Sequence, residues 1–361
     1  MATAADDDPA SLVELINEFV DVCKRYLLIG DDDQSSTPQT TKFSDDMFEK
    51  IEEITDLTMN SSNGKECLSA FLRNPHIVDT FCSLLQMARS SVCAYLISDT
   101  TSSGSSKEKH YQVKVFFHLT TLIRLIWYLS NFSVDFRQRF HERNGTKYLL
   151  SYLQDASLVK YCIETETIEL DLNEPSLTYL ADIFGSSIIQ LELNSFLISI
   201  LGTLHNISKS DLTQTDLNEL TETLLAFSSL VNSLGRARTC LIMAYMTLAL
   251  TLTDREIDEL KDINEIVAKL MQLIERASTA IAEGGKALKR SRIELESAGK
   301  FEQVCMVGYE DLDMEFDLVE LISSLYHIAV NDKIKHFIYF DCDAKVYIER
   351  IVRHGNGVEK E

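Results

Sequence analysis

Proline is the residue that most constrains how this chain can fold, because it occurs only 4 times in 361 residues and never after Pro175. Glycine is also sparse, with 13 occurrences. These two residues interrupt helices and form the tight turns of hairpins. Their scarcity, together with 45% hydrophobic residues, predicts an all-α protein with long helices and a substantial core.

The charge of the chain limits the partners that it can bind. The sequence has 56 acidic and 34 basic side chains, a formal net charge of −22. Nucleic acids and anionic membrane surfaces are bound through clustered Lys and Arg, so we expect neither as a partner. The acidic start MATAADDDPA lacks the features of a secretory signal, and the longest apolar stretch, 240–253, is shorter than the roughly 18 residues of a membrane span. We therefore expect a cytoplasmic protein.

Polar stretches divide the chain into regions. A helix over 11–28 is followed by the polar segment 31–41, so we expect residues 1–42 to form an N-terminal helix and linker that precede a domain over 43–361. Apolar periodicity predicts further helices over 44–58 and 65–98, with Pro75 marking an element boundary. Polar insertions are expected near 98–110, 155–190 and 277–315.

Similar helical groups recur along the sequence. Near residues 129, 204, 248 and 325, an apolar helix is followed by a polar break, a short helix and a second apolar helix. Alignment of these groups superimposes Asn131, Asn206, Leu250 and His327, which are 75, 44 and 77 residues apart. These separations equal about two, one and two periods of a unit of roughly 40 residues, the length typical of helical repeats.

This pattern resembles the armadillo repeat, and the "LSNFS" group followed by Gly145 and "YLLSYL" carries the resemblance best. The resemblance covers about 65–356 and implies an armadillo-like, right-handed helical-repeat solenoid. The segment "LYHIAVNDKIKHFIYFDCDAKVYIERIVRHGNGVEKE" is similar to the armadillo-type region that precedes a TIR domain in a family of invertebrate proteins. That similarity implies the regulatory or sensing region of an innate-immune or cell-death signalling protein.

One pair of residues has the spacing of a known peptide-binding device. Armadillo proteins that bind extended peptides carry a ladder of Trp-x-x-x-Asn pairs, and here Trp127 and Asn131 form one such pair. At the aligned positions stand Gly202 with Asn206, Met246 with Leu250, and Ser323 with His327, so most pairs are incomplete. We expect Trp127 to be a packed aromatic residue. The candidate partner-binding residues are Trp127, Asn131, Asn206 and His327.

Motifs for chemistry are missing from the sequence. The eight cysteines form no CxxC pair, the histidines lack the spacing of a zinc helix, and no nucleophile–base–acid set is visible. We therefore expect no metal, no cofactor and no enzymatic activity. The sequence favours a scaffold that binds another protein or another domain of its own full-length chain. The alternative is an allosteric module that senses a nucleotide and restrains an effector domain, with Arg124, Arg236 and Arg238 as candidate cations.

The last predicted group ends in an apolar helix. Helices are expected over 318–330, 333–340 and 344–353, and the last of these carries Val346, Ile348, Ile351 and Val352. Terminal repeats normally present a polar outer face. We therefore expect an incompletely covered edge here, which further chain or a partner would cover.

Overall fold

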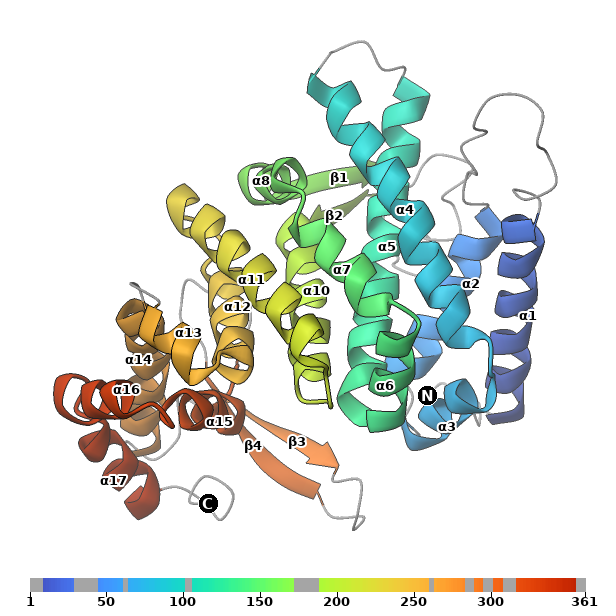
Figure 1. The fold of residues 1–361 in the computed structure, drawn as a ribbon. Coiled ribbons are helices and arrows are strands. Elements are labelled where there is room, and N and C mark those ends of the chain that lie inside the picture. The colour runs from blue at the N-terminus through green and yellow to red at the C-terminus, as the bar shows by residue number, and fades with distance from the viewer. Residues whose placement is uncertain are drawn as a thin grey trace. The chain divides into compact units, whose positions relative to one another are not determined.

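The computed structural model of the chain is mostly helical, which confirms the predicted helical class (Figure 1). The structure describes residues 9–28, 45–60, 64–100, 106–171, 188–259, 263–282, 289–294, 301–307 and 316–354. The chain divides into two compact units, Met1–Asp211 and Leu212–Glu361. Each unit is built from its own helices and has its own buried residues.

Nine helices and one two-stranded sheet of the first unit lie in the described ranges. The helices are α1 (Pro9–Leu28), α2 (Asp45–Asn60), α3 (Gly64–Arg73), α4 (Ile77–Thr100), α5 (Ser106–Phe132), α6 (Val134–Glu142), α7 (Gly145–Leu153), α8 (Ala156–Thr165) and α10 (Leu193–Ser208). Strands β1 (Thr167–Asp171) and β2 (Ile188–Glu192) pair antiparallel, with Thr167 opposite Glu192.

Local sequence explains where several of these helices begin and end. The break between α3 and α4 contains Pro75, as predicted. The hydroxyl of Ser133 accepts a hydrogen bond from the Phe136 backbone N–H and so caps α6. At the start of α7, a Cβ atom on Gly145 would lie 2.5 Å from Cε1 of Phe140, so only glycine fits beneath that ring.

Helix α5 lies at the centre of the first unit and packs against α2, α4 and α10. Aromatic rings fill the space between the helices: Phe81 contacts Phe19, Phe71 and Phe136, with ring centroids 6.3 to 6.4 Å apart. Phe19 lies on α1, which also packs against α2, α3 and α4. The N-terminal helix is thus part of the core of this unit.

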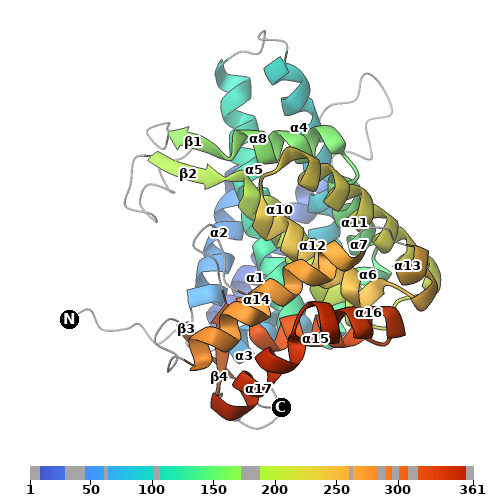
Figure 2. The ribbon, with the colours of Figure 1, turned by 90° about the vertical axis from the view of Figure 1, so that its left-hand side faces the viewer.

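The second unit contains long and short helices and a small sheet (Figure 2). Its helices are α11 (Gln214–Leu234), α12 (Arg238–Thr251), α13 (Asp254–Glu259), α14 (Ile263–Ala282), α15 (Leu318–Ile328), α16 (Asp332–His336), the π-helical turn η2 (Phe337–Asp341) and α17 (Ala344–His354). Strands β3 (Lys289–Glu294), β4 (Phe301–Val307) and β5 (Phe316–Asp317) form the sheet in that order.

Two successive groups in the second unit share one order of helices. The first group is α12, the short α13 and α14, and the second is α15, the short α16 with η2, and α17. The helices that correspond in the two groups pack against each other, α12 on α15 and α14 on α17. The predicted helices over 318–330, 333–340 and 344–353 match the second group closely.

Two of the predicted polar insertions contain regular structure. Residues 156–165 form α8, which is capped by the side chain of Asp155. The sequence TIELD of β1 alternates polar and apolar residues, the period-two pattern of a strand, and this short signal is easily overlooked between helices. In the other interval, 289–294 pairs with 301–306 in antiparallel fashion.

Candidate functional site

Two of the predicted site residues meet where α5 packs against α10. The indole of Trp127 lies over Gly202, where a Cβ atom would overlap Cε2 and would lie 2.6 Å from both Cζ2 and Nε1. One turn further along α10, the Nδ2 of Asn206 donates to the Trp127 carbonyl at 3.3 Å and to the Ser130 Oγ at 3.0 Å. Trp127 and Asn206 therefore both contribute to the contact between α5 and α10.

The other two predicted residues do not join this contact. Asn131 is exposed near the end of α5, and His327 is exposed on α15 in the second unit. A peptide-binding ladder needs the indole and the amide of each pair to face one groove. Here the indole of Trp127, which is half-buried, contributes to helix packing while Asn131 faces solvent.

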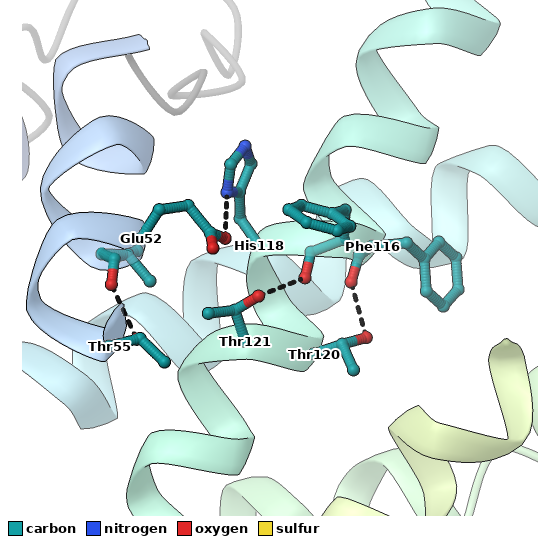
Figure 3. A network of polar contacts seen from close by, with 8 residues as sticks. Glu52, Thr55, Phe116, His118, Thr120 and Thr121 are labelled. Carbon is teal, nitrogen blue, oxygen red and sulfur yellow. Dashed lines mark hydrogen bonds and ion pairs between the residues drawn. The ribbon is translucent and has the colours of Figure 1, made fainter. Parts of the chain in front are cut away.

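The first unit also contains a buried acid–base pair that the sequence analysis did not find. The Nδ1 of His118, on α5, lies 3.0 Å from Oε1 of Glu52, on α2 (Figure 3). Only 0% of the His118 side chain and 7% of the Glu52 side chain are exposed. The two atoms share one hydrogen bond, in which the imidazole tautomer sets the donor.

Neighbouring polar groups around this pair are satisfied within their own helices. The hydroxyl groups of Thr55 and Thr120 donate to the carbonyls of Ile51 and Phe116, four residues earlier (Figure 3). A general base must reach the proton that it abstracts, and a fully buried imidazole offers no access to a substrate. The pair therefore serves to connect α2 with α5.

His118 stands out in the sequence, because it interrupts the apolar run VFFHLTTLIRLIW. Its partner is 66 residues away, and no local pattern connects the two. A histidine within an apolar helix face predicts a buried partner without naming it.

Exposed apolar side chains gather in one region of the second unit. Of the eleven large hydrophobic residues that are exposed in the described ranges, nine lie between residues 319 and 352. We call the first set, all on or just after α15, the α15 face: Val319, Ile322, Tyr326 and Val330. The second set, on η2 and α17, is the α17 group: Tyr339, Phe340, Val346, Ile348 and Val352.

The last helix carries the incompletely covered apolar surface that the sequence suggested. Val346, Ile348 and Val352 are 45%, 57% and 50% exposed, whereas Ile351 is buried and α17 packs against α14. Arg350 turns back to donate a hydrogen bond to the Thr279 hydroxyl on α14. In the described part of the chain, α17 packs against α14 and η2, and these three apolar side chains remain exposed.

Thiol and metal chemistry receive little support from the described residues. Burial raises the pKa of Cys23 and of Cys82 to about 12, which keeps both thiols protonated. The pKa of half-buried Cys342 is raised by burial and further by Asp341 and Asp343. No group of three or more His, Cys, Asp or Glu side chains within the described part of the chain is arranged to hold a metal ion.

One helix among the described residues is long and apolar enough to span a membrane, over Val113–Phe132 in α5. Of its most apolar window, 78% is buried inside the protein. Core helices of soluble proteins commonly pass the same test of length and composition, so this finding is weak evidence for a membrane span.

Comparison of the chain with family models, with curated proteins and with solved structures finds no match.

Proposed function

We propose that this chain is a helical-repeat scaffold of the armadillo type, without enzymatic activity, whose second unit binds another protein. The repeated order of helices supports the repeat architecture, because α12 and α15, and likewise α14 and α17, pack as equivalent helices of neighbouring repeats would. Stacked repeats share a continuous core and offer extended surfaces for partners.

The concentration of exposed apolar side chains between residues 319 and 352 is the observation that carries this proposal. Large contiguous apolar patches on a protein surface usually mark sites of interaction. Tyr326 is 74% exposed and Phe340 is 63% exposed, and aromatic residues of this kind are enriched at the centres of protein interfaces.

The resemblance of the C-terminal segment gives the proposal a cellular setting. We propose that the chain acts in the cytoplasm as the regulatory region of a TIR-type signalling protein, with a partner protein or another domain of the full-length chain on this surface. The net charge of −22 argues against nucleic acid and anionic membranes as alternatives.

Site-specific photo-crosslinking tests the proposal. A photoreactive phenylalanine analogue placed at position 326 should give a discrete covalent adduct with a protein in cells, identified by mass spectrometry. The matched control carries the analogue at Val134, which is 59% exposed on α6 and lies outside both apolar sets. Equal labelling at the two positions, or no protein adduct at 326, would show that this surface does not bind a protein.

A further inference from the structure

We infer that the first unit binds a phosphorylated side chain of a partner peptide through two arginines at the end of α6, beside the beginning of α4. The two residues are Arg139 and Arg143, which we call the α6 arginine pair. This inference goes beyond the proposed function, because the pair belongs to the first unit, whereas the α15 face and the α17 group belong to the second.

The α6 arginine pair reaches the beginning of α4 at two successive points. The backbone N–H of Arg143 donates to the Arg139 carbonyl at 3.1 Å, so the two residues are one helical turn apart. Nη2 of Arg139 donates to the Pro75 carbonyl at 3.2 Å, and Nε of Arg143 lies 3.1 Å from Oδ1 of Asp79. Val134, five residues before Arg139, lies about 140° around the helix and so on another side of α6.

Each guanidinium group of the pair is held by one nitrogen and keeps further donors. Within the described part of the chain, Nε and Nη1 of Arg139 and both Nη atoms of Arg143 make no hydrogen bond. A guanidinium group has five N–H donors in a planar fork, which matches the oxygen atoms of a phosphate group. Because one bond already orients each side chain, the pair loses less conformational freedom on binding than two mobile arginines would.

Positive charge is concentrated around the pair, in contrast to the rest of the chain. Residues 73–79 and 134–147 contain five Lys or Arg and three Asp or Glu side chains, although the whole chain has a net charge of −22. One of the five is exposed Arg73, which lies two residues before Pro75. The carboxylate of Asp79 is included in this balance, so a surplus of two positive charges remains for an anionic ligand.

A phosphate monoester fits this arrangement better than a carboxylate does. It carries a charge of about −1.5 to −2 at pH 7 and three acceptor oxygens, so one phosphate can accept hydrogen bonds from both arginines. A carboxylate carries a charge of only −1, and a single arginine satisfies it in bidentate fashion. Nucleic acids and anionic membranes extend beyond the small basic region and would be repelled by the acidic rest of the chain.

The exposure of the site favours a peptide as the source of the phosphate. The side chains of Arg143 and Asp79 are 62% and 39% exposed. Small phosphorylated molecules are normally bound in concave pockets that bury most of the ligand. A phosphorylated side chain that projects from a peptide can reach an open surface, and arginine clusters commonly recognise such side chains.

Fluorescence anisotropy with the full chain tests this inference. The probe is a fluorescein-labelled library of nonapeptides with phosphoserine at the centre, and the same library with serine is its control. We expect a Kd of roughly 1 to 100 µM for the phosphorylated library and binding at least about 10-fold weaker for the serine library. Arg139→Gln/Arg143→Gln should weaken binding of the phosphorylated library by about 10-fold or more, because both guanidinium groups are removed.

A matched variant separates this site from general attraction to arginine. Arg353→Gln removes an exposed arginine that is paired with Glu349 on α17, and it should leave binding of the phosphorylated library unchanged. Circular dichroism should show that both variants keep the helical content of the wild type.

Four results would overturn the inference. They are equal binding of the phosphorylated and serine libraries, unchanged binding in Arg139→Gln/Arg143→Gln, an equal loss in Arg353→Gln, and displacement of the phosphorylated library by an equal concentration of inorganic phosphate. The last result would mean that the site takes a free anion rather than a peptide.

Discussion

Trp127 and Gly202 form the contact in which a single atom has the largest effect on packing. A methyl group at Gly202 would overlap the indole ring, so α5 and α10 approach closely only because that atom is missing. We expect Gly202→Ala to lower the free energy of unfolding by about 1–3 kcal/mol, the usual cost of overpacking a core. Urea unfolding followed by circular dichroism measures the change.

A double-mutant cycle identifies Trp127 as the cause. In a Trp127→Leu background, where the indole is removed, Gly202→Ala should cost much less than it does alone. Equal costs in the two backgrounds would mean that Trp127 does not fill the space above Gly202. The alignment of the repeats had placed Trp127 and Gly202 at equivalent positions, but it could not show that the two residues touch.

The cysteines give a prediction about pH. Burial and two carboxylates raise the pKa of Cys342, so at pH 8 a smaller fraction of this thiol is ionised than of an ordinary thiol, whose pKa is about 8.5. The rate at which iodoacetamide alkylates Cys342 should therefore continue to rise as the pH is raised above about 8.5. Cys23 and Cys82, with pKa values of about 12, should be alkylated only after unfolding. Peptide mass spectrometry quantifies each site.

Neutralising one neighbour tests the cause of this shift. Asp343→Asn should lower the pKa of Cys342 and speed its alkylation near pH 8, because one negative charge is removed. Asp332→Asn is the control, since its carboxylate bonds to Lys335 and does not act on Cys342. If Cys342 is alkylated faster in Asp332→Asn, or no faster in Asp343→Asn than in the wild type, Asp343 does not raise the pKa of Cys342 as described.

At the scale of elements, the Glu52–His118 pair connects α2 to α5 across 66 residues of sequence. His118→Leu should lower the free energy of unfolding by about 3 kcal/mol, because it leaves a buried carboxylate without this partner. The double variant Glu52→Leu/His118→Leu should be more stable than His118→Leu alone, since it removes both polar groups. Chemical denaturation of the three proteins measures this difference.

Exposed His76 provides the control for that experiment, and His76→Leu should change the unfolding free energy by less than about 0.5 kcal/mol. If Glu52→Leu/His118→Leu is less stable than His118→Leu, Glu52 stabilises the fold through contacts other than the one with His118.

Helix positions could be predicted where the signal is local. Pro75 separates α3 from α4, and the break at Gly145 precedes α7, both as the sequence indicated. The sequence did not predict the strands β1 and β2, because each has only five residues and its partner lies elsewhere in the sequence. The sequence also aligned Asn131 with Asn206 as equivalent residues. In the structure Asn206 is buried between helices and Asn131 is exposed, because burial depends on contacts that a local pattern does not show.

At the scale of the whole molecule, two compact units meet in sequence between Asp211 and Leu212. This position lies outside the helices, between α10 and α11. The sequence suggested a domain over 43–361, because similar helical groups recur in the sequence on both sides of this position. The division into two units follows from contacts between residues that are far apart in sequence, and a local sequence pattern does not show such contacts.

The division predicts how fragments of the chain behave. Fragments 1–211 and 212–361, produced separately, should each unfold cooperatively on heating, because each contains its own buried residues. A cut after Leu224, which is fully buried inside α11, is the control and should give fragments with weaker or no cooperative transitions. Far-UV circular dichroism follows the unfolding of all four fragments. A fragment 1–211 or 212–361 without a cooperative transition, or equally cooperative fragments from the cut after Leu224, would show that the division into units lies elsewhere in the chain.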